Sequence, residues 1–251
     1  RILIDTGDKE TSPEYMKLLK SVLDEEKVTI SHLLITHWHH DHIGGAKDIQ
    51  RSLTSASNSV PTVWKLPRYS DDKVQEEYEV DLELLQDEQL LKVEGATLTV
   101  KHTPGHTTDH ACFLLHEDNV LFSGDCILGE GTAVFEDLRD YLISLSKILN
   151  MTPSVIYPGH GPIVENPTDK IQYYIGHRMK REEEILKVLM TNMRKSFSPM
   201  DIVEIIYKET PRSLWPAAAI NVGHHLEKLL KDGKVLKQGS DEWLYAIKGK
   251  I

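Results

Sequence analysis

The feature that most constrains this chain is a crowded turn at positions 36–45, Thr-His-Trp-His-His-Asp-His-Ile-Gly-Gly. Imidazoles and carboxylates are costly to remove from water, so several of them in one short turn favour a structure in which a cation binds them. Imidazole nitrogen and carboxylate oxygen are the usual non-sulfur ligands of zinc. The HxHxDH spacing therefore predicts a transition-metal site, with zinc as the expected ion.

Other ligand-type side chains follow three strand-like segments, each on a turn that contains glycine. A rigid strand that ends in such a turn can aim a side chain at a shared site. The seven candidate ligands are His37, His39, Asp41, His42, His106, Asp125 and His160. We assign the first of two metal ions to His37, His39 and His106. The second is assigned to Asp41, His42 and His160, with Asp125 as the bridge between the two ions.

With these seven residues in this order, the chain resembles the metallo-β-lactamase superfamily, whose signature is an HxHxDH loop followed by a separate His, an Asp and a second His. The resemblance implies an α/β fold of the αββα sandwich type. The antibiotic-hydrolysing zinc enzymes of the superfamily have a cysteine where this chain has Asp125, and its oxygen-reducing di-iron members have a glutamate where it has His39. Both differences favour zinc-dependent hydrolysis of a substrate other than a β-lactam.

Within the superfamily, the turn at 36–42, the run at 122–132 and the C-terminal extension are similar to the β-lactamase-like protein 2 group. Members of that group are described as mitochondrial endoribonucleases that act on single-stranded RNA. The resemblance implies an endoribonuclease with two Zn²⁺ per chain and a location in the mitochondrial matrix. A cytoplasmic location is the alternative.

The expected mechanism is hydrolysis of a phosphodiester by a hydroxide that the metal ions generate from water. Zinc lowers the pKa of bound water from about 15.7 to about 7, so hydroxide is available at neutral pH. Asp41 and Asp125 take part in catalysis as ligands that hold this hydroxide in place. Asp5 is expected behind the ligands, where a carboxylate can orient a ligand histidine or the ligand loop. His110 is the candidate for the acid that protonates the leaving group.

Composition limits the class of protein. A chain of 251 residues with 40% hydrophobic content can bury one large core and a small additional unit. Its two cysteines, Cys112 and Cys126, are too few for a disulfide framework and favour a reducing compartment. The longest apolar runs are far shorter than the ~20 residues that a membrane-spanning helix needs. The sequence starts inside a strand-like run, Arg1 to Gly7, so we expect strands that precede this run in the superfamily to be missing.

The pattern of the first two thirds predicts alternating helices and strands, as in a layered α/β sandwich. The expected helices are 12–23, 46–53 and 137–150, and the expected strands are 29–36, 62–65, 96–102, 111–116, 119–123 and 154–157. Apart from the strand at 62–65, residues 54–92 are polar and are predicted to form irregular surface loops. We place a catalytic domain at 1–167 that lacks its N-terminal strands.

The remaining residues predict three helices and a two-stranded ribbon, which is the order of a winged helix. The helices are expected at 168–190, from Ser198, and at 217–231, and the strands at 234–237 and 242–247. A winged-helix-like domain is therefore placed at 168–251, and a helical brace for the catalytic domain is the alternative. His224 and His225 are adjacent on one helix and cannot both face one metal ion, so we expect them to be structural.

Charge separates the two parts of the chain. From residue 170 onward there are 15 Lys or Arg and 10 Asp or Glu, a balance of +5, so the total of −10 leaves −15 for residues 1–169. An acidic surface repels nucleic acid at long range, and only a local positive field offsets this repulsion. The basic C-terminal unit and the metal ions supply such fields. We expect weak, salt-sensitive binding of single-stranded RNA as substrate. The sequence gives no sign of DNA specificity or of a membrane, and it leaves the oligomeric state open, with a monomer as one option.

Two other functions are compatible with the sequence. A thioester hydrolase of the glyoxalase II type uses the same seven ligands, although it requires a compact basic pocket for a glutathione carboxylate. An inactive RNA-binding or scaffold protein is the alternative from another class, and the complete ligand set argues against it.

Overall fold

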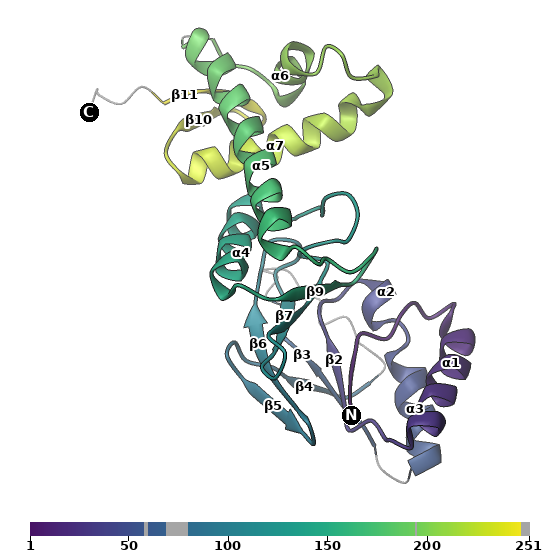
Figure 1. Cartoon of the computed structure of the whole chain (residues 1–251). Helices are drawn as coiled ribbons and strands as arrows, with labels where there is room; N and C mark the ends of the chain where they lie inside the picture. The colour runs from purple at the N-terminus through teal and green to yellow at the C-terminus, as the bar shows by residue number, and fades with distance from the viewer. Residues whose placement is uncertain (58–59, 69–79, 194, 247–251) are drawn as a thin grey trace. The chain divides into compact units, whose positions relative to one another are not determined.

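The computed structural model describes residues 1–57, 60–68, 80–193 and 195–246 (Figure 1). They form two compact units: one comprises Arg1–Phe135 and Asp140–Ile171, and the other comprises 136–139 and the described residues from 172 onward. The helix α5, Pro167–Thr191, begins in the first unit and continues into the second. The domain boundary placed at 167 and 168 falls at the start of this helix and stays a prediction.

The first sheet of the larger unit is entirely parallel. Its strands β1 (Ile2–Ile4), β2 (His32–Ile35), β3 (Thr62–Lys65) and β4 (Leu82–Leu84) lie side by side in this order. Helices α1 (Ser12–Glu26) and α3 (Ala46–Ser57) connect β1 to β2 and β2 to β3. Leu33 and Ile35 of β2 pack in a cluster with Met16 of α1 and Ile49 of α3. Because β2 is buried on both faces, its sequence is a continuous apolar run rather than an alternating one.

The second sheet faces the first. Its order is β5 (Leu90–Val93), β6 (Ala96–His102), β7 (Ala111–Leu115), β8 (Val120–Gly124) and β9 (Val155–Pro158), and only the pair β8–β9 is parallel. Leu34 of the first sheet shares a buried cluster with Val100 and Phe113 of the second. Between β8 and β9 lies α4 (Leu138–Met151), whose Tyr141 hydroxyl donates to the carbonyl of Cys126 at 2.7 Å. These layers form the expected α/β sandwich.

The prediction of irregular loops over 54–92 was wrong at three places, because the end of α3, β4 and most of β5 lie in this range. The strands β4 and β5 are each at the edge of their sheet. The exposed fraction of Leu84 in β4 is 60% and that of Leu90 in β5 is 52%, whereas Leu91 is buried. Edge strands with so few buried positions carry no clear alternation, so their sequences resemble polar loops. Residues 69–79 of the same predicted loop lie outside the described residues.

The smaller unit has the predicted order of helices and ribbon. It contains the C-terminal part of α5, α6 (Pro199–Ile206), the short 3₁₀ helix η1 (Arg212–Leu214), α7 (Trp215–Lys231), β10 (Val235–Gln238) and β11 (Glu242–Tyr245). Ser198 caps α6 by accepting from the Asp201 amide at 3.1 Å, and the Asp201 carboxylate accepts in return from the Ser198 amide at 2.8 Å. Val222, Leu226 and Trp243 lie in its core. Residue 247 of the predicted last strand lies outside the described residues.

His225 lies in that core, fully buried, and neither ring nitrogen has a hydrogen-bond partner among the described residues. Burial lowers the pKa of His225 to about 3, and the charges of Arg178, Arg181 and Lys228 act in the same direction. The unfolded chain takes up a proton below about pH 6.5 whereas the folded unit does not, so stability falls from there toward pH 3, by at most ~1.4 kcal/mol per pH unit.

We expect His225→Leu to remove most of this loss, measured as thermal unfolding at pH 7 and pH 5. An equal acid sensitivity of the variant would contradict this assignment, and His224→Leu is the control.

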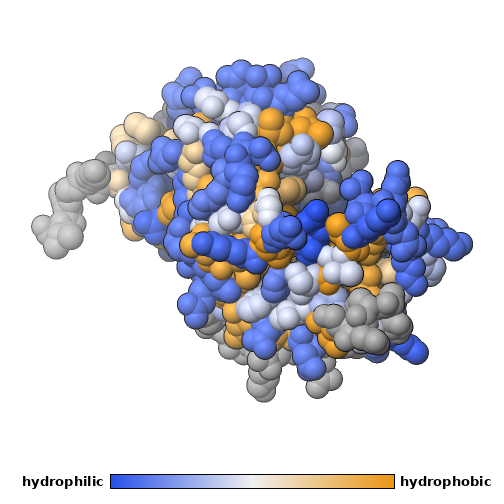
Figure 2. All heavy atoms as spheres, turned by 60° about the horizontal axis from the view of Figure 1, so that its bottom comes forward, coloured by the Kyte–Doolittle hydropathy of each residue, from blue (hydrophilic) through white to orange (hydrophobic). Residues whose placement is uncertain are grey.

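The face of the molecule in Figure 2 is largely hydrophilic. In the view of Figure 2, hydrophobic residues appear in separate small groups between hydrophilic ones. Among the described residues, no helix is both long and apolar enough to cross a membrane.

Candidate metal centre

The HxHxDH turn leaves the carboxyl end of β2 and is anchored to the neighbouring strands. It contains the one-turn helix α2, His40–Ile43. The amide and hydroxyl of Thr6 both donate to the carbonyl of His42, at 2.7 and 2.8 Å. From the second sheet, the amide of Ala111 donates to the carbonyl of Thr36 at 2.8 Å. The histidines of the turn are therefore held against both sheets.

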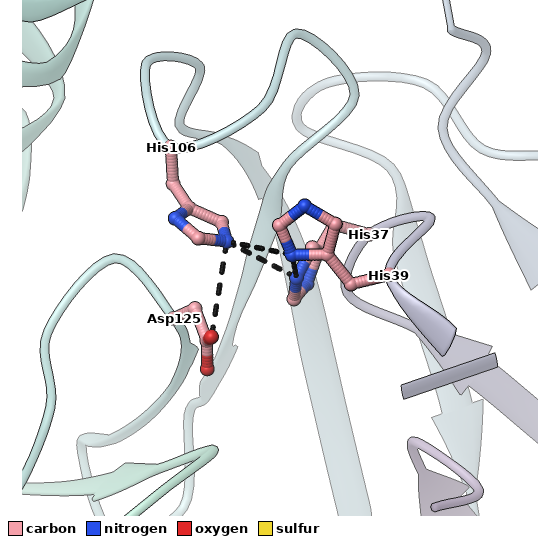
Figure 3. Close-up of side chains that lie close together, drawn as sticks. All are labelled: His37, His39, His106 and Asp125. Carbon is pink, nitrogen blue, oxygen red and sulfur yellow. Dashed lines mark hydrogen bonds and ion pairs between the residues drawn. The ribbon is translucent and has the colours of Figure 1, made fainter. Parts of the chain in front are cut away.

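The first group of ligand atoms comprises His37, His39, His106 and Asp125 (Figure 3). The Nε2 atoms of His37 and His106 are 3.2 Å apart, and His39 Nδ1 lies 2.9 Å from the first and 3.1 Å from the second. An Asp125 oxygen, Oδ2, lies 3.8 Å from His106 Nε2. His37 and His106 are buried, and His39 is half-buried. The three rings point toward a common centre from the turns after β2 and β6, and the Asp125 carboxylate joins them from the turn after β8.

The second group comprises Asp41, His42 and His160. His160 Nε2 lies 2.9 Å from an Asp41 oxygen, and His42 Nε2 lies 3.5 Å from the same atom. The other oxygen of Asp125, Oδ1, is 3.4 Å from His42 and 3.6 Å from His160. One Asp125 oxygen thus faces each group, so the structure brings together all seven predicted residues and places Asp125 between the two groups.

The geometry of these atoms suits metal ions. Zinc binds imidazole nitrogen at about 2.0–2.1 Å, so two nitrogens of a tetrahedral site lie about 3.3 Å apart. The nitrogens of the first group lie 2.9–3.2 Å apart. His106 Nδ1 donates to the carbonyl of Val134 at 2.8 Å, which leaves the lone pair of Nε2 directed at the group. His42 Nε2 and Asp125 Oδ1 are buried and have no hydrogen bond within the described part of the chain. Such atoms are satisfied when they bind a cation.

Asp5 supports both groups from behind. Its Oδ2 accepts from His42 Nδ1 at 2.7 Å and from the Thr36 hydroxyl at 2.9 Å, and its Oδ1 accepts from the Thr36 amide at 2.8 Å. Because the Thr36 hydroxyl donates to Asp5, its oxygen is free to accept from His37 Nδ1, 2.9 Å away. Both contacts keep the proton of the ring on Nδ1 and leave Nε2 for a metal. One carboxylate therefore sets the tautomer of a histidine in each group.

The carboxylates around His42 also change its acidity. Burial lowers the pKa of His42, but Asp125 and Asp5 outweigh burial and raise it to about 10. By contrast, burial is the main cause that lowers the pKa of His37, and it lowers that of His106 to about 4. In the first group the rings are therefore neutral near pH 7, as metal ligands must be.

Asp5→Asn should weaken metal binding at both groups, because the amide cannot accept in the same way from His42 and Thr36. Loss of such a supporting partner typically reduces metal affinity or activity about 10–100-fold. Competition with a chelator, followed for each bound ion, measures the change. Asp8→Asn is the control, because this carboxylate accepts from the Glu10 amide, away from the ligand histidines. A loss confined to the His42 group would show that the path through Thr36 does not matter.

The geometry argues against His110 as the acid that protonates the leaving group. His110 is fully buried, its Nδ1 lies 2.9 Å from the Thr103 hydroxyl, and its Nε2 accepts from the Asp125 amide at 3.1 Å. Both ring nitrogens are thus used within the protein, and neither is directed at a substrate. The contact with Asp125 instead gives His110 a role in holding the turn that carries this ligand.

Two supporting contacts were not predicted from the sequence. The first is the contact of Thr36 with Asp5, for which the signal in the sequence is a hydroxyl residue directly before a ligand histidine. Lys65, the last residue of β3, forms a buried ion pair with Asp109, and its ammonium also donates to the carbonyl of Leu66 at 3.0 Å. A lysine at the end of a buried strand was the signal for this pair.

A pocket of about 400 Å³ opens beside the second group. Asp41, His42 and His160 line it together with aromatic side chains that include Tyr15 and Tyr157. The exposed fractions of the Asp41 and His160 side chains are 47% and 50%, so the second group is open to solvent, whereas the nitrogens of the first group are largely covered.

Residues 1–160 match the metallo-beta-lactamase superfamily, and residues 198–243 match the beta-lactamase associated winged helix domain. The chain therefore belongs to the metallo-β-lactamase superfamily, as predicted. It is close to proteins called "Beta-lactamase-like protein 2 homolog". The one from Drosophila melanogaster is 49% identical, over 98% of this chain and 84% of that protein. The one from Caenorhabditis elegans is 44% identical, over 94% of this chain and 76% of that protein.

Fungal enzymes are also related. An "Atrochrysone carboxyl ACP thioesterase" of Emericella nidulans is 32% identical, over 97% of this chain and 76% of that protein. The chain is thus a hydrolase of the metallo-β-lactamase fold, with two candidate His/Asp metal sites of the kind found in the binuclear centres of this superfamily.

Solved structures confirm the predicted fold. A metallo-β-lactamase family protein from Thermus thermophilus superposes with a TM-score of 0.70 at 21% identity, over 97% of this chain and 89% of the other. A β-lactamase domain protein from Burkholderia ambifaria gives 0.77 at 19% identity, over 98% of this chain and 82% of the other. The α/β sandwich and the C-terminal winged helix are both features of this chain.

Proposed function

We propose that this chain is a zinc-dependent endoribonuclease that cleaves single-stranded RNA by hydrolysis. The observation that carries the proposal is the position of Asp125, with one oxygen toward each group of ligand atoms. Two-metal sites are common in enzymes that hydrolyse phosphodiesters. The net charge of +5 from residue 170 onward and the high identity to the β-lactamase-like protein 2 homologues support RNA as the substrate.

The residues of the site divide the work. His37, His39 and His106 would hold one zinc ion, and Asp41, His42 and His160 the other, with Asp125 between them. When bound, the two ions would supply activated water and offset the negative charge of a phosphodiester. Asp5 keeps the ligand rings in the tautomer that binds metal. Because the pKa of His42 is raised to about 10, its ring carries a second proton near pH 7 and must lose it before the ring can bind a metal.

The test uses purified protein and labelled single-stranded RNA, with a double-stranded RNA and a single-stranded DNA of the same sequence. Metal content is measured by elemental analysis on the same sample. We expect about two zinc ions per chain, internal cuts in the single-stranded RNA and little cutting of DNA. Intact RNA in the presence of a fully loaded metal site would show that the proposed substrate is wrong.

Thioester hydrolysis is the second candidate, and the fungal relatives named as acyl carrier protein thioesterases favour it. The metal ligands alone do not separate the two reactions, because both need activated water. S-lactoylglutathione and an acyl carrier protein thioester should therefore be assayed beside the RNA. Turnover of either thioester without cleavage of RNA would place this candidate first.

The mitochondrial matrix remains the proposed location. Fluorescence microscopy of the tagged full-length protein with a matrix marker tests it, and a diffuse cytoplasmic signal would contradict it.

A further inference from the structure

Many of the positively charged side chains of the smaller unit are already paired with carboxylates. Four lysines near the end of α7 and on the following ribbon are paired with carboxylates. They are Lys228 with Glu182 and Asp232, Lys231 with Asp137, Lys234 with Glu182 and Lys237 with Glu227. A cation that already faces a carboxylate adds little net positive field for a phosphate. The ribbon is therefore a poor place to bind RNA, although it is rich in lysine.

Lys208 and Arg212 differ from these lysines. Within the part of the chain that the structure describes, neither forms an ion pair with a carboxylate. Both line a pocket of about 400 Å³ between the end of α6 and the start of α7, together with Glu204, Thr210 and Trp215. The volume is within the range of small-ligand sites, about 300–1,000 Å³.

The indole of Trp215 is held in place at this pocket. Its Nε1 donates to the carbonyl of Thr210 at 3.0 Å, and part of the ring packs against the core of the unit. The Arg212 guanidinium carbon lies 5.3 Å from the centre of the ring. A fixed aromatic ring beside two cations is the combination that binds single-stranded nucleic acid, in which bases stack on rings and phosphates meet Lys or Arg.

We propose that this pocket binds one or two nucleotides of single-stranded RNA, with a base against Trp215 and phosphates against Lys208 and Arg212. The inference rests on the proposed function for its choice of ligand, but it concerns a binding site outside the metal ligands. Glu204 is the one carboxylate among the lining residues and opposes the binding of a phosphate. The pocket should therefore bind RNA more tightly when this charge is removed.

Binding is measured by fluorescence anisotropy with labelled single-stranded RNA over a range of salt concentrations, in the Asp125→Asn background so that the RNA stays intact. For Lys208→Ala/Arg212→Ala we expect the dissociation constant to rise about tenfold at 0.1 M salt. The slope of its logarithm against the logarithm of salt concentration should fall by about 1.4, since each phosphate contact contributes roughly 0.7. Lys234→Ala/Lys237→Ala removes the same charge from paired lysines and is the matched control. An equal loss in both double variants would overturn the proposal.

Two further variants test the chemistry of the pocket. Trp215→Leu keeps an apolar side chain against the core and removes the ring, so binding should weaken about 5-fold or more with little change in the salt slope. Glu204→Gln should tighten binding and raise no question of folding, because it is an exposed side chain. Unchanged affinity in both variants would show that the pocket does not contact RNA, even if the double variant fails to fold.

Kinetics separate this proposal from the proposed function. In the otherwise unchanged enzyme, Lys208→Ala/Arg212→Ala should raise KM for RNA and leave kcat unchanged. If this double variant cleaves RNA with the KM of the parent enzyme, the binding site is refuted and the nuclease assignment stands. If RNA binds through this pocket but is never cut, the binding site stands and the nuclease assignment is wrong.

Discussion

Asp125→Asn is expected to abolish hydrolysis while the protein stays folded. Asp125 faces both groups of ligand atoms, with its two oxygens 3.4 Å from His42 Nε2 and 3.8 Å from His106 Nε2. An amide offers one weaker oxygen ligand and one nitrogen that cannot bind a metal. The loss should therefore exceed the ~10–100-fold that is typical when only a partner behind the ligands is removed.

The measurements are zinc content, hydrolysis of RNA and of the two thioesters, and thermal unfolding. Asp118→Asn, an exposed aspartate beside β8, is the matched control and should behave as the parent protein. Full activity of Asp125→Asn with an intact fold would exclude the binuclear site as the catalytic centre.

Gly105→Ala is expected to have the largest effect on stability. Gly105 precedes His106 and has a φ of +129°, which side chains other than glycine rarely adopt. A Cβ atom there would lie 2.3 Å from the backbone nitrogen and Cα of Tyr141 in α4, which are not free to move. Strain and overpacking each cost about 1–3 kcal/mol, so the free energy of unfolding should fall by roughly 2–6 kcal/mol.

The control for this variant is Gly95→Ala. Gly95 also has a positive φ, of +78°, but no atom lies within 4 Å of an added Cβ. It should show the cost of backbone strain alone and leave metal binding intact. Denaturant unfolding and zinc content of the two variants give the comparison. If both lose equal stability and both keep zinc, the close approach of α4 does not hold the His106 turn in place.

The ligand set could be predicted from the sequence because the chemistry of metal binding leaves few alternatives. His37, His106 and His160 each follow a strand on a short turn, and in the structure they belong to two groups of ligand atoms that share Asp125 as a neighbour. The function of His110 could not be predicted, because its role depends on the Asp125 amide, which is close only in the folded chain. Spacing along the sequence does not show which ring nitrogen is already used.

The folds of the two units were predictable to different depths. Buried strands such as β2 and β6 have strong patterns, whereas β4 and β5 at the sheet edges do not. In the smaller unit the helices and the ribbon followed from caps and periodicity. The pairing of Lys228 and Lys234 with the buried Glu182 did not, because it joins α5 to residues 46 and 52 positions further along the chain. The net charge of a segment therefore overstated how much positive field the ribbon can offer.

The ligands come from both layers of the sandwich, since the turn after β2 belongs to one sheet and His106, Asp125 and His160 follow strands of the other. Bound ions would link the two layers through their ligands and add to the packing of the cluster around Leu34 and Phe113. Removal of the metal ions by a chelator should then have an effect beyond the loss of hydrolysis. It should loosen one layer against the other, and limited proteolysis would detect this as new cleavage sites in the connections between the sheets.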